Sequence, residues 1–237
     1  MSILRLDGLT KEFRGVHAVQ GVTFTAEAGR ITSVVGPNGA GKSTLFNMIS
    51  GYLRPTTGRV YFKGEDITEL PTYRIAQRGI VRAFQIAKPF PELSVQKNVA
   101  VAAMFGKAGP RDVEDTVARA IDLCRLRPFA QTTASVLSVG NLRRLELGRA
   151  IAARPELLLA DEPFAGLNET ETHEMGEVLQ SICASGVTVV LVEHDIKAVR
   201  RISDRVVVLE TGRLIADGSA DEVFSSQAVI DAYLGTA

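Results

Sequence analysis

Gly36-Pro37-Asn38-Gly39-Ala40-Gly41-Lys42-Ser43-Thr44 is the stretch that decides the fold, because it matches the phosphate-binding pattern G-x-x-x-x-G-K-[S/T]. Residues 31–35 before it have the pattern of a short buried strand, and residues 45–49 after it have that of a helix. Glycines let the backbone turn tightly with its N–H groups directed inward, and the helix start adds unpaired N–H groups and a positive dipole end. We therefore expect this loop to bind a nucleotide, with Lys42 at the β- and γ-phosphates and Ser43 on Mg²⁺.

Composition limits the class of protein. The chain has 237 residues, enough for one large domain or one domain with a subdomain. Lys+Arg and Asp+Glu both number 27, so the basic excess typical of nucleic-acid binders is missing, and we expect no nucleic acid partner. The two cysteines form neither a disulfide framework nor a metal motif. A charge at Arg5 comes too early for a signal peptide, and no apolar run approaches a membrane span, so we expect membrane association only through a protein partner.

The N-terminal part of the chain predicts β structure around the phosphate-binding strand. Residues 3–7, 20–26 and 60–62 combine β-branched and apolar residues with turn signals between them, which is typical of antiparallel hairpins. Phe13 could stack its ring on a nucleotide base, although a core or edge-strand phenylalanine is the simpler interpretation. Residues 72–82 have a helical pattern, and residues 81–85 predict a short strand that ends in Gln85.

The middle of the chain predicts an inserted helical segment. Pro89 and Pro91 interrupt regular structure, and Ser94 fits the N-cap of a helix that the glycines at 106 and 109 end. A second helix is expected from Pro110 to Pro128. We place a helical subdomain at 88–150, with a catalytic core and β subdomain formed by 1–87 and 151–237.

Residues 137–141, Leu-Ser-Val-Gly-Asn, open the next helix, with Ser138 as its N-cap. Apolar residues follow on one face, and Arg143, Arg144 and Arg149 lie on the other. Taken alone, this pattern indicates an amphipathic helix with a solvated basic face.

Two acidic residues follow a second buried strand. Residues 157–160 are continuously apolar, as expected of a central parallel strand, and they lead into Asp161 and Glu162. Open α/β sheets bind ligands at this end of their strands. We expect Asp161 to hold Mg²⁺ through water and Glu162 to orient and deprotonate a water molecule. A simple acidic turn is the alternative.

A third buried strand at 187–192 precedes His194. Between the two strands, Asn168 fits the N-cap of a helix that has Glu171 at its third position. Because His194 follows a strand of the same sheet edge as Asp161, we expect it to reach a γ-phosphate or an attacking water. A structural histidine is the alternative. The remaining residues predict a hairpin at 206–216 and helices at 221–224 and 229–233.

Nearly the whole chain resembles the ATP-binding subunits of ABC transporters. Residues 36–44 resemble the Walker A loop, residues 157–162 Walker B, residues 137–141 the signature loop and residues 165–168 the D-loop. Gln85 resembles the Q-loop glutamine, His194 the switch histidine and Phe13 the A-loop aromatic. The chain departs from the family pattern at Val139, Asn141 and Asn168, where Gly, Gln and Asp are usual, and Phe13 replaces the usual Tyr.

The resemblance implies an α/β P-loop NTPase with a mostly parallel RecA-like core sheet, an antiparallel β subdomain and an inserted α-helical subdomain. It implies ATP as the nucleotide, Mg²⁺ held by Ser43, Gln85 and Asp161, and catalytic roles for Glu162, His194 and Gln85. It also implies that Ser138 and Gly140 complete the site of a second ATPase subunit, identical or paralogous, in a head-to-tail dimer.

Several short segments resemble one branch of the family, the ATPases of branched-chain amino acid importers, which include urea and amide importers. They are residues 82–85, 89–95, 161–168, 192–195 and 232–235. This resemblance implies membrane permease subunits, an extracytoplasmic solute-binding protein and a peripheral position on the cytoplasmic face of the inner membrane. Lipopolysaccharide-export ATPases share Asp-Glu-Pro-Phe-Ala-Gly but resemble the chain less around Gln85. Soluble ABC proteins acting on DNA or ribosomes, and small-molecule P-loop kinases, are more distant alternatives.

Overall fold

The computed structural model describes residues 1–85, 88–106 and 112–234, and their strands form two sheets. The larger sheet has the order β10-β9-β3-β8-β7-β6. All neighbours in it are parallel except β9 and β10. Its strands are β3 (Ile31–Val35), β6 (Ile80–Ala83), β7 (Leu157–Asp161), β8 (Thr188–Val192), β9 (Arg205–Glu210) and β10 (Arg213–Gly218). The predicted mostly parallel core sheet is confirmed.

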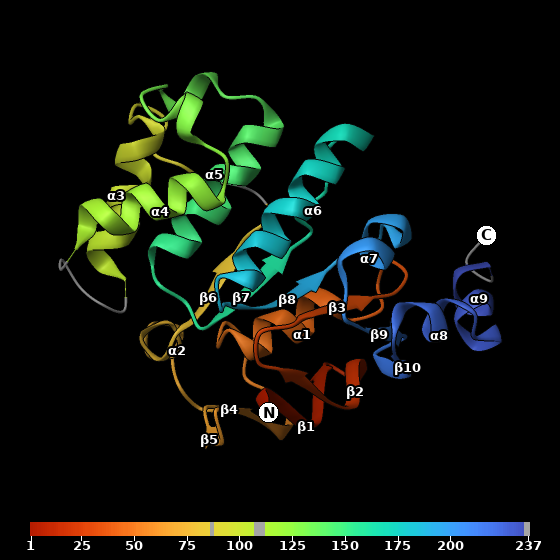
Figure 1. Ribbon diagram of the computed structural model, residues 1–237. Coiled ribbons are helices and arrows are strands. Elements are labelled where there is room, and N and C mark those ends of the chain that lie inside the picture. The colour runs from red at the N-terminus through yellow and green to blue at the C-terminus, as the bar shows by residue number, and fades with distance from the viewer. Residues whose placement is uncertain (86–87, 107–111, 235–237) are drawn as a thin grey trace.

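The smaller sheet is antiparallel and has the order β2-β1-β4-β5. Its strands are β1 (Ser2–Phe13), β2 (Val16–Glu27), β4 (Thr57–Phe62) and β5 (Glu65–Asp66). A hydrophobic cluster joins this sheet to helix α1 (Lys42–Ile49) and to one face of the large sheet, through residues such as Leu6, Phe24, Phe46 and Leu157. In Figure 1 α1 accordingly lies between the two sheets.

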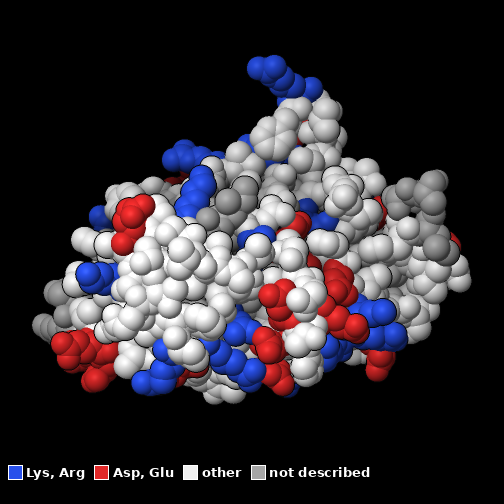
Figure 2. All heavy atoms as spheres, turned by 90° about the horizontal axis from the view of Figure 1, so that it is seen from above, with Lys and Arg blue, Asp and Glu red and all other residues white. Residues whose placement is uncertain are grey.

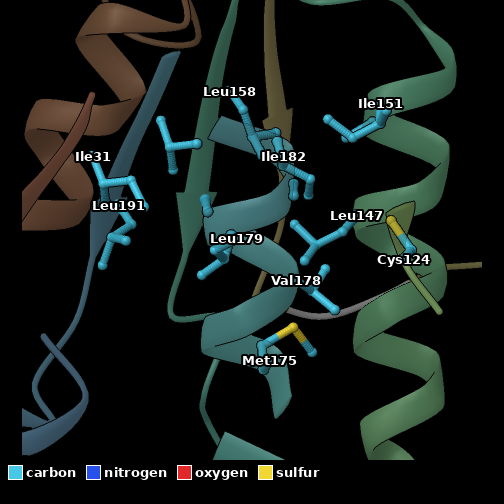
Figure 3. Packing of buried hydrophobic residues seen from close by; sticks show 14 of the residues in the cluster. Ile31, Cys124, Leu147, Ile151, Leu158, Met175, Val178, Leu179, Ile182 and Leu191 are labelled. Carbon is cyan, nitrogen blue, oxygen red and sulfur yellow. The ribbon is translucent and has the colours of Figure 1, made fainter. Parts of the chain in front are cut away.

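Helices of the described chain share a hydrophobic cluster with the other face of the large sheet. They include α3 (Val95–Phe105), α4 (Val113–Leu123), α5 (Val139–Ala152), α6 (Glu169–Ala184) and α7 (Ile196–Ile202). Figure 3 shows Val178, Leu179 and Ile182 of α6 among side chains of the sheet, such as Leu158, and of α5, such as Leu147. A single hydrophobic cluster therefore ties the helical segment to the sheet, and Figure 1 shows α3, α4 and α5 grouped at one end of the molecule.

Two predicted helices end earlier in the structure than their sequence patterns indicate. Helix α2 (Thr72–Arg78) stops at Gly79, whose φ of 106° is left-handed, and Ile80 already belongs to β6. Helix α4 stops at Cys124, well before Pro128, and is followed by the 3-10 turns Arg127–Phe129 and Ala134–Val136. Helix α3 ends at Phe105 with Gly106 as its C-cap, which confirms the start of the predicted glycine break. The rest of that break, residues 107–109, the helix start at Pro110 and the final Gly235 lie outside the described residues. The domain boundaries at 88 and 150 stay a prediction.

The chain ends in helices α8 (Ala220–Phe224) and α9 (Gln227–Leu234), which lie beside β9 and β10 in Figure 1. None of the helices in the described part of the chain combines the length and apolar character needed to cross a membrane. Figure 2 shows that, among the described atoms of one face, acidic and basic side chains are mixed and form no continuous basic stripe.

Candidate active site

The phosphate loop, residues 36–44, connects β3 to α1 in a conformation that only glycine fits at two positions. Gly36 has a φ of 148°, and a Cβ there would lie 2.0 Å from the carbonyl oxygen of Leu209. Gly41 has a φ of 95°, and a Cβ there would lie 2.3 Å from the carbonyl oxygen of Ala18. The loop is therefore held between β9 and β2 at van der Waals distance, which fixes the direction of its N–H groups.

Lys42 begins α1 and is 7% exposed. Its Nζ donates hydrogen bonds to the carbonyl oxygens of Gly36, at 2.6 Å, and Pro37, at 2.9 Å. Burial lowers the pKa of Lys42, an effect that the carboxylates of Glu162 and Glu193 partly oppose. An ammonium group held inside this loop is a suitable partner for phosphate oxygens.

The N-terminus of α1 is also suited to an anion. Its N-cap, Gly41, supplies no side-chain hydrogen bond, and its first turn contains no acidic residue. Helices α3, α5, α6 and α7 have capping side chains instead, from Ser94, Ser138, Asn168 and Asp195. The first N–H groups of α1 are therefore left for a ligand, and Ser43, exposed on the first turn, can present its hydroxyl to a cation bound there.

A cavity of about 640 Å³ brings the phosphate loop together with two residues from distant strand ends. Its lining consists of Gly36, Pro37, Asn38, Glu162, His194 and Tyr233. Glu162 follows β7 and His194 follows β8, and these strands are parallel neighbours. Parallel pairing thus places both side chains at the edge of the sheet where the phosphate loop begins.

Glu162 has an unusual backbone conformation. Its φ of 47° is left-handed, and its N–H donates to the carbonyl oxygen of Val192 at 3.0 Å. The side chain accepts a hydrogen bond from Nε2 of Gln85, which follows β6. Sparsely populated backbone conformations of this kind persist where surrounding contacts impose them, often at functional sites. Here they direct Glu162 toward the phosphate loop while Asp161 stays in the strand.

Asp161 and Glu193 are the buried acids of this edge. Asp161 is paired with Arg82, a residue of the adjacent strand β6. Glu193 is fully buried and accepts hydrogen bonds from the N–H groups of Phe164, at 2.9 Å, and His194, at 3.0 Å. Burial raises the pKa of Glu193, and these hydrogen bonds partly oppose the rise. Glu193 therefore links the loop after Glu162 to the backbone of His194.

Ser138 and Gly140 lie elsewhere in the same chain. They line a separate cavity of about 230 Å³ with residues of α6, including Glu171. Oγ of Ser138 accepts a hydrogen bond from the N–H of Asn141 at 3.3 Å, so the predicted N-cap is present. Neither residue lines the cavity of the phosphate loop, so the structure does not bring them to the loop of their own chain.

Phe13 lies at the end of β1 and its side chain is 45% exposed, so it is not a core residue. Its ring centroid is 5.2 Å from Nζ of Lys11. The hairpin that carries it reaches the phosphate loop through the close approach of Ala18 to Gly41. An exposed aromatic ring on a hairpin beside the loop is in a position to contact a nucleotide base.

The predicted solvated basic face of α5 is wrong. Nη2 of Arg143 donates to the carbonyl oxygen of Ala165 at 3.2 Å, and Arg144 pairs with Glu174 of α6. Arg149 donates to the carbonyl oxygen of Lys88 at 2.9 Å. All three partners are distant in sequence, so helical periodicity alone could not reveal them. Sequence reasoning also gave no site role to Arg82 or Tyr233.

Two family models match parts of the chain. Residues 19–165 match the family model described as ABC transporter, and residues 213–237 match the one described as branched-chain amino acid ATP-binding cassette transporter. The chain is 38% identical to the high-affinity branched-chain amino acid transport ATP-binding protein BraF of Pseudomonas aeruginosa, over 99% of this chain and 98% of that protein. It is 36% identical to the corresponding LivG of Escherichia coli, with the same coverage.

Solved structures show the same relationship. A nucleotide-free ATP-binding cassette from an ABC transporter superposes with a TM-score of 0.88 at 31% identity, covering 98% of this chain and 99% of that one. The ADP conformation of another ABC transporter cassette gives a TM-score of 0.90 at 30% identity, with 99% of both chains covered.

Proposed function

The chain belongs to the ABC transporter family, and from that premise we propose that it powers an importer of branched-chain amino acids or related small solutes such as urea or amides. It is an ATP-binding and ATP-hydrolysing subunit. The observation that carries the proposal is the cavity in which the phosphate loop meets Glu162 and His194. Both named relatives act in branched-chain amino acid transport, which favours this solute class over lipopolysaccharide export.

The residues around the cavity suit ATP hydrolysis. The phosphate loop, Gly36 to Thr44, holds the phosphates through N–H groups and Lys42, and Phe13 contacts the base. Glu162 accepts a proton from the water that attacks the terminal phosphorus, while the bond to ADP breaks and its electron pair stays on ADP. Gln85 and His194 orient that water and the terminal phosphate. Mg²⁺, when bound by Ser43, Gln85 and Asp161, neutralises charge on the phosphates.

A second ATPase subunit completes the site. Ser138 and Gly140 line a different cavity from the phosphate loop of their own chain, which supports this arrangement. Their hydroxyl and N–H groups can then bind only a nucleotide held by another chain. A bacterial ABC transporter cassette described as dimeric superposes on this chain with a TM-score of 0.80 at 26% identity, over 92% of this chain. The partner subunit is either identical or a paralogue.

Permease subunits dock in a groove on the side of the molecule. This lateral groove, a cavity of about 820 Å³, is lined by Tyr52, Arg82, Phe84, Gln85, Phe105 and Asp161, among others. The exposed fraction is 57% for Tyr52 and 86% for Phe105, which is unusual for aromatic and apolar groups gathered at one site. An apolar segment of a permease fits such a groove. The ATPase is then peripheral on the cytoplasmic face of the membrane, and a solute-binding protein acts on the opposite face.

Co-purification tests the proposal. The chain is expressed with the permease subunits of the transporter, and a tag on the permease recovers the complex from detergent-solubilised membranes. We expect the native chain to be recovered and Phe105→Asp to reduce recovery about tenfold or more, because burying a phenylalanine contributes about 1.5–3 kcal/mol. Nucleotide affinity, measured in the same variant, should stay unchanged.

The matched control is Ile230→Asp on α9, which places the same charge on an exposed apolar residue outside the groove. It should be recovered like the native chain. Recovery of the native chain with ribosomes or DNA in place of the permease would contradict the transport function. Normal recovery of Phe105→Asp would contradict the assignment of the groove.

A further inference from the structure

Arg82 is a buried cation that neither the phosphate loop nor the proposed catalytic groups account for. It lies on β6, and its side chain is only 9% exposed. Nη2 donates to Oδ2 of Asp161, and Nη1 donates to Oδ1 of Asn47 on α1 at 2.6 Å. Nε is buried and has no hydrogen-bond partner among the described residues. One guanidinium therefore bridges the helix that follows the phosphate loop to the acid at the end of β7.

Aromatic rings surround the same guanidinium. Its carbon lies 4.9 Å from the ring centroid of Phe84, 5.9 Å from that of Phe46 and 6.0 Å from that of Tyr52. Tyr52 and Phe84 are in edge contact, with centroids 5.7 Å apart and planes at 88°. These three rings form an aromatic cage that attracts a cation independently of any carboxylate. The guanidinium can thus keep favourable contacts if Asp161 turns away.

The proposed function gives Asp161 a second cationic partner. A carboxylate that holds Mg²⁺, directly or through water, does so with its oxygens, and Oδ2 of Asp161 accepts the hydrogen bond from Arg82. With a side chain 10% exposed, Asp161 is too buried to remain without a compensating positive charge. Arg82 supplies that charge through its guanidinium, and a divalent cation can supply it instead. The two cations therefore compete for one carboxylate.

We propose that Arg82 is a positioning residue that holds Asp161 and yields it to the divalent cation when the metal–nucleotide complex binds. This inference rests on the proposed ATPase site. The exchange moves the guanidinium within its cage, and Arg82, Tyr52 and Phe84 all line the lateral groove. Binding of the divalent cation and binding of a partner in the lateral groove are therefore coupled through the side chain of Arg82.

A double-mutant cycle on nucleotide binding tests the competition. The affinity for a fluorescent, non-hydrolysable ATP analogue is measured with excess Mg²⁺ and with EDTA, and the ratio of the two affinities is compared among variants. We expect Arg82→Met to raise the preference for the Mg²⁺ form about tenfold, the size of a charged hydrogen bond, because unpaired Asp161 repels metal-free phosphates and is free for the metal. In an Asp161→Asn background Arg82→Met should have no effect on the ratio.

Arg59→Met is the matched control, because Arg59 pairs with Asp66 at 2.7 Å on the exposed β4–β5 hairpin. It should leave the ratio unchanged. The Arg82→Met/Asp161→Asn variant removes both buried charges, so the cycle stays measurable if Arg82→Met alone is unstable. Arg82→Gln, which is also neutral, then replaces Arg82→Met as the single variant. An unchanged or lower ratio in the Arg82 variants, or the same rise without Asp161, would overturn the inference. Failure of the native chain to bind the analogue would instead refute the ATPase site.

Tryptophan fluorescence can report movement of the Arg82 side chain in a variant that retains this arginine. The chain contains no tryptophan, so Tyr52→Trp introduces a single indole beside the guanidinium. Addition of Mg²⁺ to the complex with the metal-free analogue should change its emission, and the change should disappear when Arg82→Met is added. A metal-dependent change that persists without Arg82, or no change in Tyr52→Trp, would contradict the movement of Arg82.

Discussion

Several residues of the site are arranged for a ligand and not for the stability of the folded chain. Lys42 is a buried ammonium whose pKa burial lowers, and Glu193 is a buried acid whose pKa burial raises. Glu162 has a left-handed φ. Each feature costs free energy in the absence of a compensating partner, as is common where residues are held ready for a reaction.

Lys42→Met should weaken ATP binding without lowering the stability of the ligand-free chain. The substitution removes a charge that folding disfavours, so the ligand-free variant should unfold at the same temperature as the native chain or a higher one at pH 7. Its affinity for ATP should fall about tenfold or more, because a charged hydrogen-bond donor to the phosphates is lost. Calorimetric melting and a nucleotide titration measure the two effects, with Lys63→Met, at an exposed ion pair with Glu156, as the control.

The pH dependence of this difference follows from the direction of the shift. A cation whose pKa is lowered by folding destabilises the folded state below that pKa, and the cost disappears as the pH rises past it toward 10.5. Any stability advantage of Lys42→Met should therefore be largest near pH 7 and shrink at alkaline pH. An advantage that grows with pH would contradict this explanation.

At the scale of elements, α9 closes the nucleotide cavity from the far end of the sequence. Val229 and Ala232 are buried, at 2% and 3% exposure, which fixes the helix against the body of the protein. Tyr233 then lines the cavity beside Gly36 and Pro37. Burial raises the pKa of Tyr233, and the nearby backbone of Gly36 partly opposes the rise. The last helix thus supports the first residue of the phosphate loop.

Replacement of Tyr233 should affect both stability and nucleotide binding. Tyr233→Ala should cost about 1–3 kcal/mol because it leaves a cavity. We expect the alanine variant to bind nucleotide more weakly, since Gly36 loses its support. Urea unfolding and nucleotide titration measure these changes. Equal nucleotide affinity of Tyr233→Ala and the exposed-site control Tyr73→Ala would contradict the role of α9.

The elements show what sequence patterns can and cannot predict. Strands β3, β7 and β8 and the capped helices α3, α5 and α6 follow from apolar runs and N-cap residues, which are local signals. The end of α2 was missed because Gly79 outweighs the helical pattern that continues past it. The partners of Arg82 and Arg143 were missed because each contact joins segments distant in sequence. The sequence motifs also marked the cavity residues, except Tyr233.

On the scale of the whole molecule, the residues that we propose for one composite site line two separate cavities. The phosphate loop, Glu162 and His194 share one cavity, and Ser138 and Gly140 line another near α6. Arg143 and Arg144 connect the helix that begins after Ser138 to Ala165 and Glu174. We propose that a second ATPase subunit supplies the Ser138 and Gly140 groups, so that ATP binding is coupled to association of the two subunits.

The molecular mass in solution of the Glu162→Gln variant, measured in saturating ATP and Mg²⁺, tests most directly whether two ATPase subunits share a composite site. Light scattering after size-exclusion chromatography is applied to the variant alone and to its mixture with the second ATPase subunit of the transporter. We predict no steady-state hydrolysis, retained ATP binding and a complex of two ATPase subunits that EDTA or the added substitution Ser138→Arg dissociates. A single chain in both samples at saturating ATP, or hydrolysis at the native rate, would contradict the composite site and the role of Glu162.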